Sequence, residues 1–297
     1  FMRISRYYPQ IGYDASNEIE DENIRKQFQL GKRTQIKPLE APKVPNNDFV
    51  SLDMTVATEA NQTVIGVGEL TKQWKENHRN VFQYKINAIP FRFAISSANY
   101  AVKKENYKGK NFEVYYHPTH SENVAHLIKN AKITMDYCET NFGKYPFKTI
   151  RFAEISGFTN GFNATAYPAT IYMNENMSFH CNILADKQQD VINELAGHEL
   201  AHLWWGNSQI DPDEREGNVM LTETLAMYTE LMLLKKMYGK QKAEECVAMH
   251  QDIFENEKGF SGDAPLIKVT GYLTHIAYSK GAVAMYKLSE LIGEDKV

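Results

Sequence analysis

The sequence has little cysteine and no long hydrophobic run. Its 297 residues include three cysteines, Cys138, Cys181 and Cys246, which are far apart and form no CxxC pair. That spacing excludes a thioredoxin-like redox motif and a cysteine-based zinc knuckle, so we expect three buried free thiols. No apolar stretch approaches the roughly 20 residues that a membrane-spanning helix needs.

A basic excess is also missing. Lysine and arginine total 33 against 37 aspartates and glutamates, which gives a net charge of −4. Nucleic-acid-binding proteins normally carry a strong positive balance, so the composition gives no reason to expect a nucleic-acid partner. With 43% hydrophobic residues, the chain can bury a sizeable core, and its length suggests two domains.

Alternating sequences in the first half predict β-strands. Residues 1–45 hold an aromatic turn, a charged segment at 18–28 that could form a short surface helix, and a proline-rich linker. Beyond them, apolar and polar side chains alternate, which places one face of a strand on a core and the other in solvent. The predicted strands are 50–56, 82–86, 91–95 and 112–116. With a polar turn expected around 72–80, the pattern favours an antiparallel sandwich or saddle.

From Ser121 the pattern becomes mostly helical. Ser121 is expected to cap a helix that ends near Gly143. Strand-like runs follow at 148–155 and 169–173, and further helices are predicted at 188–205, 217–238, 240–257 and 275–292. The expected fold class is therefore α+β, with a β-rich N-terminal domain at 1–118 and a mainly helical domain at 119–297.

The most informative segment is an HExxH motif at 198–202, within a stretch that reads as helix. Residues four apart lie on one face of a helix, so His198 and His202 can present two imidazoles to one metal ion. Glu199 would lie beside the metal, where a carboxylate can take a proton from an attacking water. The alternative is a solvated helix face. The apolar neighbours argue against it, because a histidine pair in an apolar helix needs polar partners or a metal.

A catalytic zinc ion has three protein ligands and leaves one position for water. Glu223 lies near the start of the next predicted helix among apolar residues, where a carboxylate is not expected to be buried without a charge partner. Glu214 and Glu216 are rivals for the third ligand, although their surroundings are typical of a solvated loop. Glu230, on the same helix face as Glu223, could hold a ligating histidine in place or could lie on the helix surface.

These residues resemble the gluzincin metallopeptidases of the aminopeptidase N type, a family that includes leukotriene hydrolase. The motifs that carry the resemblance are HExxH at 198–202, Trp204-Trp205-Gly206-Asn207 and Leu221-Thr222-Glu223. Twenty residues separate the motif from Glu223, slightly more than in the family pattern. An insertion around 211–217 accounts for the difference, because the flanking helices still align.

The resemblance implies a role for each of these residues. His198, His202 and Glu223 would bind one Zn²⁺, and Glu199 would act as the general base. Far downstream, the segment 278–282, Tyr-Ser-Lys-Gly-Ala, looks like the family's Tyr-Glu-Lys-Gly segment, whose tyrosine hydrogen-bonds the transition-state oxyanion. Tyr278 takes that role by resemblance. Without it, packing at a helix start would be the simpler interpretation.

One family motif is incomplete in this sequence. Exopeptidase members carry Gly-x-Met-Glu-Asn on an edge strand before HExxH, and its Glu grips the free amine of the substrate. The corresponding segment is 159–168, in which Gly161 fits but no Glu is present. We still expect Gly161, Phe162 and Asn163 to contact substrate, because an edge strand can bind peptide backbone.

The chain as a whole is most similar to bacterial proteins in which such a peptidase-like domain follows the membrane-spanning permease of an ABC-type exporter. The segments 8–13, 141–147 and 293–297 carry this resemblance. It implies a thermolysin-like catalytic domain that continues in further helices beyond residue 297. It also implies a larger parent protein in the bacterial cell membrane, on a side that the sequence does not indicate.

The expected function is zinc-dependent, aminopeptidase-like hydrolysis of a peptide substrate. Two alternatives stay open. The missing amine-binding Glu allows an endopeptidase, and the likeness to exporter-linked proteins allows a zinc-binding, peptide-recognising accessory domain of a transporter with little turnover. A complete ligand set together with Glu199 favours an active enzyme.

Overall fold

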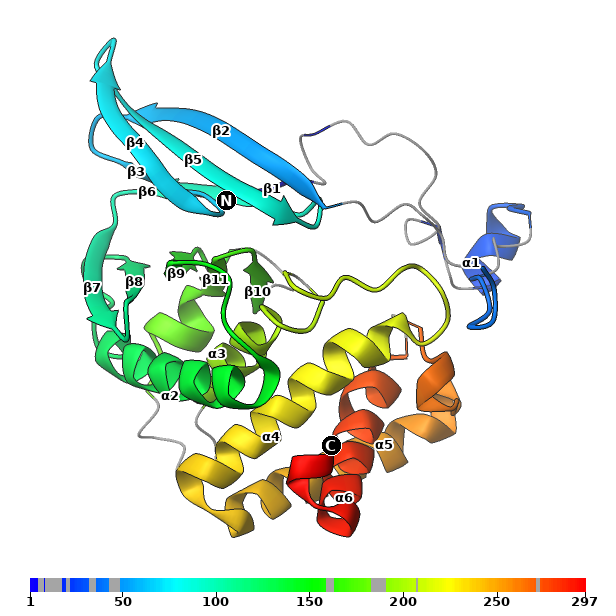
Figure 1. Cartoon of the computed structure of the whole chain (residues 1–297). Helices are drawn as coiled ribbons and strands as arrows, with labels where there is room; N and C mark the ends of the chain where they lie inside the picture. The colour runs from blue at the N-terminus through cyan, green and yellow to red at the C-terminus, as the bar shows by residue number, and fades with distance from the viewer. Residues whose placement is uncertain are drawn as a thin grey trace.

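The structure is a computed structural model of the 297-residue chain. Two small sheets lie above a five-stranded sheet, and helices cover the other face of that sheet and continue to the C-terminus (Figure 1). The α+β class expected from the sequence is confirmed. The structure describes residues 1–4, 8, 18–19, 22–31, 36–42, 49–158, 163–182, 191–206, 208–270 and 273–297.

Two three-stranded sheets form the N-terminal part. One has the order β2 (Val50–Glu59), β5 (Arg79–Ile89), β4 (Glu69–Glu76), and the other has the order β1 (Met2–Arg3), β6 (Ala94–Ala98), β3 (Thr63–Ile65). The turn expected at 72–80 is wrong for most of its length, because this polar segment forms the exposed edge strand β4. The turn is confined to Asn77 and His78, whose positive φ angles suit a tight hairpin.

The five-stranded sheet has the order β10 (Ala164–Tyr167), β11 (Thr170–Asn174), β9 (Thr149–Ile155), β8 (Lys110–Tyr116), β7 (Ala101–Tyr107). β9 pairs in parallel with β8 and β11, and the edge strands β7 and β10 are antiparallel to their neighbours. β8 precedes and β9 follows the domain boundary expected at 118, so backbone hydrogen bonds run across it. We propose that the unit built on this sheet begins at β7.

The helices begin and end close to the predicted limits. They are α1 (Glu22–Gln27), α2 (Val124–Phe142), α3 (Val191–Ala201), α4 (Leu225–Tyr238), α5 (Lys240–Ser261) and α6 (Gly281–Ile292). Two single π-helical turns, η4 (Met220–Thr224) and η6 (His275–Lys280), lead into α4 and α6.

The start of α2 differs from the prediction. Asn123 rather than Ser121 occupies the cap position, and it makes no side-chain cap. Its side-chain amide donates instead to backbone carbonyl groups at Ser178, Phe179 and Cys181. Tertiary contact therefore outweighs the local capping preference at this helix end.

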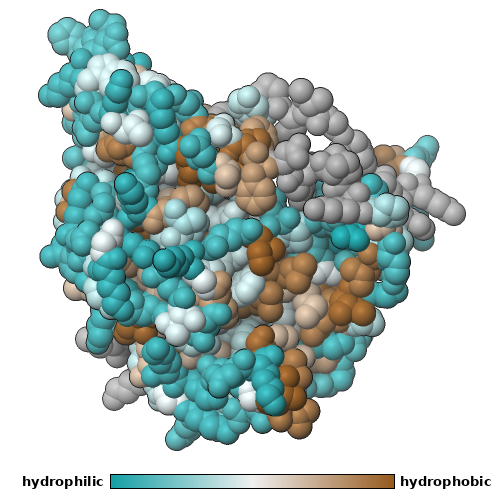
Figure 2. All heavy atoms as spheres, in the orientation of Figure 1, coloured by the Kyte–Doolittle hydropathy of each residue, from teal (hydrophilic) through white to brown (hydrophobic). Residues whose placement is uncertain are grey.

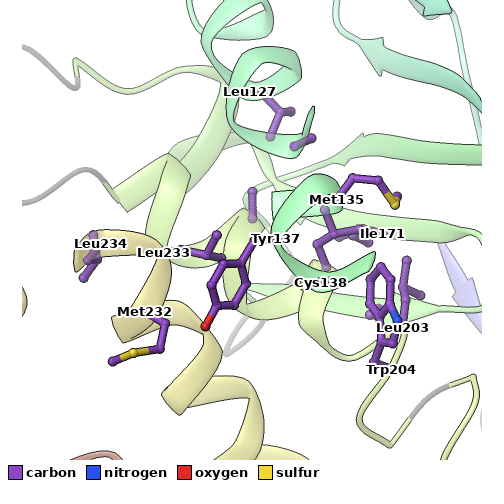
Figure 3. Close-up of a cluster of buried hydrophobic side chains, with 14 of the residues drawn as sticks. Leu127, Met135, Tyr137, Cys138, Ile171, Leu203, Trp204, Met232, Leu233 and Leu234 are labelled. Carbon is purple, nitrogen blue, oxygen red and sulfur yellow. The ribbon is translucent and has the colours of Figure 1, made fainter. Parts of the chain in front are cut away.

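The main core lies between the five-stranded sheet and the helices. Side chains from α2, β11 and α4 and from the residues just after α3 contribute to this core (Figure 3). Two of the three cysteines, Cys138 and Cys246, are buried free thiols as expected. Cys181, which follows the short π-helical segment η3 (Glu175–Phe179), is only partly buried.

The part of the chain that the structure describes contains no helix that is both long and apolar enough to cross a membrane. Hydrophobic side chains do reach the surface around α6, at the lower edge of the molecule in Figure 2. Leu288, Leu291 and Ile292 are exposed there, whereas Val283 and Tyr286 of the same helix are buried.

Candidate active site

The HExxH motif lies at the end of α3. His198 and Glu199 belong to the helix, and His202 follows its last residue, Ala201. The apolar side chains of Leu200 and Leu203 are fully buried and hold this segment against the core. The three polar residues are themselves at most 8% exposed, so the interpretation of a solvated helix face is wrong.

Three potential ligand atoms converge at this point. The Nε2 atoms of His198 and His202 lie 3.2 Å apart, and Oε2 of Glu223, from η4, lies 3.3 Å from each. Ligands about 2.0–2.1 Å from a tetrahedral zinc ion lie about 3.3–3.4 Å from one another, so this triangle fits one Zn²⁺. The rival ligands Glu214 and Glu216 are not part of the group.

The second nitrogen of each imidazole faces a hydrogen-bond acceptor. Nδ1 of His202 lies 2.9 Å from the carbonyl oxygen of Trp205, and Nδ1 of His198 lies 3.4 Å from Oε2 of Glu230. A proton on each Nδ1 leaves the Nε2 lone pairs directed at the ligand position. Glu230 is buried at 7% exposure and does not lie on the solvent-facing side of α4.

Glu199 connects the motif to the edge strand of the sheet. The backbone N–H of Ala166 on β10 lies near its carboxylate and favours the charged form. Burial raises the pKa of Glu199, although the imidazoles of His202 and His198 act in the opposite direction. A carboxyl group with a raised pKa is better matched to proton transfer near neutral pH.

Tyr278 reaches the same point from η6. Its ring stacks on that of His198, with centroids 5.8 Å apart and an interplanar angle of 17°. Burial together with the nearby carboxylate of Glu223 raises the pKa of Tyr278 far above its usual range. The hydroxyl group therefore stays protonated and can act as a hydrogen-bond donor.

A cavity of about 390 Å³ opens over these side chains. Its lining combines the motif, η4 and Tyr278 with Ala164 and Thr165 of β10 and with two residues that sequence reasoning missed, Arg92 and Asp211. Nothing local marks those two, since Arg92 lies between two N-terminal strands and Asp211 in a polar loop. Only the packing of the two parts of the chain brings them to the cavity.

The predicted substrate contacts of the incomplete motif are tested only in part. Gly161 and Phe162 lie outside the described residues. Asn163 is exposed, and its backbone carbonyl accepts a hydrogen bond from the N–H of Asn174. Among the described residues, Asn163 is absent from the cavity lining, so its contact with substrate stays a prediction.

Two histidines one helical turn apart, joined by a glutamate from the following helix and flanked by a buried proton acceptor, define the class of single-zinc metallopeptidases. Residues 126–297 match the sequence model described as the Peptidase family M1 domain. The match covers more than half of the chain, which therefore belongs to peptidase family M1.

Two known proteins are similar in sequence to this chain, over different lengths. Glutamyl aminopeptidase of Mus musculus is 22% identical over 211 residues, 66% of this chain and 21% of that protein. Aminopeptidase N of Haemonchus contortus is 20% identical over 287 residues, 90% of this chain and 28% of that protein. The chain thus spans less than a third of these curated relatives.

A solved structure supports the fold. The M1 zinc metallopeptidase of Deinococcus radiodurans superposes with a TM-score of 0.61 at 17% sequence identity. The superposition covers 84% of this chain and 54% of that one. At this low identity the likeness bears on the fold alone.

Proposed function

We propose that this chain carries the catalytic centre of a zinc metallopeptidase that hydrolyses peptide bonds in the manner of an aminopeptidase. The observation that carries the proposal is the convergence of His198, His202 and Glu223 at 3.2–3.3 Å beside the buried Glu199. The curated relatives named above are aminopeptidases, which supports the same substrate class.

Each residue then has a distinct task. Zn²⁺ bound by the two histidines and Glu223 would polarise the scissile carbonyl group and lower the pKa of water. Glu199 would take a proton from the attacking water and pass it to the leaving amine. The hydroxyl group of Tyr278 would donate a hydrogen bond to the carbonyl oxygen as negative charge develops on it. The free edge of β10 would pair with the peptide backbone.

Replacement of Glu199 tests the proposal and its main rival together. We expect Glu199→Ala to lower kcat by about 10²–10⁴-fold, because the water loses its proton acceptor. Zinc content, measured by elemental analysis, should stay equal to that of the wild-type protein. The matched control is Glu257→Ala on the exposed side of α5, which should leave both values unchanged. Activity no higher than background in both proteins would support a peptide-recognising accessory domain instead, and full activity in Glu199→Ala would contradict the catalytic assignment.

We further propose that Asp211 takes the place of the amine-binding Glu that the sequence lacks. Glu199, Asp211 and Glu223 are the carboxylates among the described lining residues, and the other two have tasks already. Burial raises the pKa of Asp211, with Arg92 acting in the opposite direction. A partly buried carboxylate gains most from a positively charged partner, which the α-amine of a peptide provides.

A pair of substrates separates exopeptidase from endopeptidase action. Wild-type protein should cleave an aminoacyl substrate with a free α-amine at least tenfold faster than its N-acetylated form. Asp211→Asn should raise KM for the free-amine substrate and leave the blocked one unchanged, whereas the exposed control Asp252→Asn should alter neither. Equal cleavage of both substrates by wild-type protein would identify an endopeptidase.

We also propose that the parent protein lies in the bacterial cell membrane and accompanies an ABC-type exporter permease. The support is the resemblance of the segments 8–13, 141–147 and 293–297 to such proteins. Immunodetection in fractionated source cells tests this location. Recovery of the native protein in the soluble fraction alone would contradict it.

A further inference from the structure

A second group of histidine and carboxylate side chains lies outside the catalytic cavity. Single potential ligand atoms of His120, Glu154 and Glu175 all lie within 4.8 Å of one another. None of these residues lines the catalytic cavity. They come from the loop before α2, the end of β9 and the first residue of η3, so the fold rather than any local motif assembles them.

We propose that His120, Glu154 and Glu175 bind a second divalent transition-metal ion, with Zn²⁺ as the best match. One imidazole nitrogen and two carboxylate oxygens are ligands that Zn²⁺ accepts, with water at a remaining position. Ca²⁺ and Mg²⁺ fit less well, because they prefer all-oxygen sites. The site is separate from the catalytic one in its residues and in its elements.

The buried carboxylate of Glu154 is the main reason to expect a metal ion at this site. It is 4% exposed, and a buried charge needs hydrogen bonds and an opposite charge. Oε2 accepts the backbone N–H of His117 at 2.6 Å, and Oε1 lies 2.5 Å from Nδ1 of His120. Within the described residues, Glu154 pairs with His120, which is charged only when it is protonated. A divalent cation would balance Glu154 and Glu175 together.

His120 is held in one orientation. Its ring contacts those of His117 and His180, with centroids 4.7 Å and 4.5 Å away, and it stacks on His180 at an interplanar angle of 19°. The ion would bind at Nδ1, on the side of the ring that faces Oε1 of Glu154, and the ring proton would then lie on the other nitrogen.

Glu175 is also pre-positioned. Its Oε1 accepts the backbone N–H of Gly157 at 2.7 Å, which leaves Oε2 for a ligand. His180 pairs with Glu122 at 2.8 Å and is largely exposed, so it borders the site instead of belonging to the ligand group. An ion held by His120, Glu154 and Glu175 would tie β9 to η3 and to the loop before α2. We therefore assign it a stabilising role at the end of β9.

Metal counting in the intact protein tests the site. Protein saturated with Zn²⁺ and separated from free metal should hold two ions per chain, and His120→Ala should hold one with unchanged peptidase activity. The retained activity shows that the variant is folded. His78→Asn, which removes an exposed imidazole from the β4–β5 hairpin, is the matched control and should hold two. One ion in wild-type protein, or two in His120→Ala, would overturn the proposal.

A complementary variant separates this site from the catalytic one. The double substitution His198→Ala, His202→Ala should lose peptidase activity and still bind one Zn²⁺. Adding Zn²⁺ should raise its melting temperature, whereas the same addition to a triple variant that also carries Glu175→Gln should have no such effect. An equal rise with millimolar Ca²⁺ or Mg²⁺ would overturn the assignment to a transition metal. Loss of all zinc from the double variant would overturn the second site while leaving the proposed peptidase function intact.

Discussion

At the scale of single residues, two carboxylates of the catalytic centre have opposite protonation behaviour. Burial acts to raise the pKa of both Glu199 and Glu223. At Glu223 the contacts of 3.3 Å with both imidazoles outweigh burial, and the pKa is far below its usual range. At Glu199 burial prevails and the pKa is raised. One carboxylate is thereby suited to bind a cation and the other to carry a proton.

Tyr278 offers a test at the same scale. We expect Tyr278→Phe to lower kcat by about 10²–10³-fold, the usual cost of losing one hydrogen-bond donor to a developing oxyanion. KM and zinc content should change little, because the stacked ring remains and the hydroxyl group is not one of the converging ligand atoms. Steady-state kinetics and metal analysis measure both. Tyr238→Phe, at a half-exposed position on α4, is the control, and an unchanged kcat in Tyr278→Phe would remove Tyr278 from the mechanism.

At the scale of elements, two π-helical turns position the residues that face the motif. Glu223 lies on η4 and Tyr278 on η6, and π-helical turns are frequent at functional sites. The turns are joined directly, because Oγ1 of Thr224 donates to the carbonyl oxygen of Ala277 at 2.5 Å. Gly281 permits this approach, since a Cβ atom there would lie 2.5 Å from Oγ1 and 2.7 Å from Cγ2 of Thr224.

Because the two turns are in contact, replacing glycine by alanine should have opposite effects on stability at Gly281 and at Gly259. In an exposed helix, glycine-to-alanine stabilises by up to about 1 kcal/mol, and Gly259→Ala on α5 should do so because nothing lies within 4 Å of its Cβ position. Gly281→Ala should destabilise by about 1–2 kcal/mol, since overpacking costs about 1–3 kcal/mol and exceeds the helix preference. It should also reduce kcat by displacing η6 from η4. Denaturant unfolding of both variants provides the comparison, and stabilisation by Gly281→Ala would contradict the packing described.

At the scale of the whole molecule, β9 and β11 hold the N-terminal sheets in place. Arg151 of β9 is 2% exposed, and its guanidinium group donates to Glu113 on β8 and to the backbone carbonyl of Gly68. Tyr172 of β11 donates to the carbonyl of Ile65 at 2.9 Å. Since Arg92 reaches the catalytic cavity from the N-terminal part, these contacts also determine one wall of the substrate site.

Removing the arginine should therefore affect the assembly of both parts. We expect Arg151→Met to lower the free energy of unfolding by about 3–5 kcal/mol, because it leaves a mostly buried Glu113 without its closest buried cation. Lys104→Met is the matched control. Lys104 pairs with the same Glu113 at 2.9 Å but is 54% exposed, and its loss should cost less than about 1 kcal/mol. Equal destabilisation by the two substitutions in chemical denaturation would contradict the bridging role of Arg151.

Several features followed from the sequence alone, because they depend on neighbours within one or two turns. The i, i+4 spacing of His198 and His202 places both imidazoles on one helix face whatever surrounds the helix. The residues around Glu223 at the start of its helix are apolar, which predicted that its carboxylate would have a charged partner. Strict alternation at 50–56 and 112–116 predicted strands that the structure contains.

Other features were decided by the tertiary structure, because they depend on contacts between residues far apart in the chain. Local sequence could not show that β8 would pair with β9 across the expected domain boundary, or that the polar segment after Lys72 would become an edge strand. Nor could it bring Arg92 and Asp211 to the cavity or assemble His120, Glu154 and Glu175. A motif of five consecutive residues can be recognised in the sequence, whereas the convergence of residues from separate elements depends on the tertiary structure.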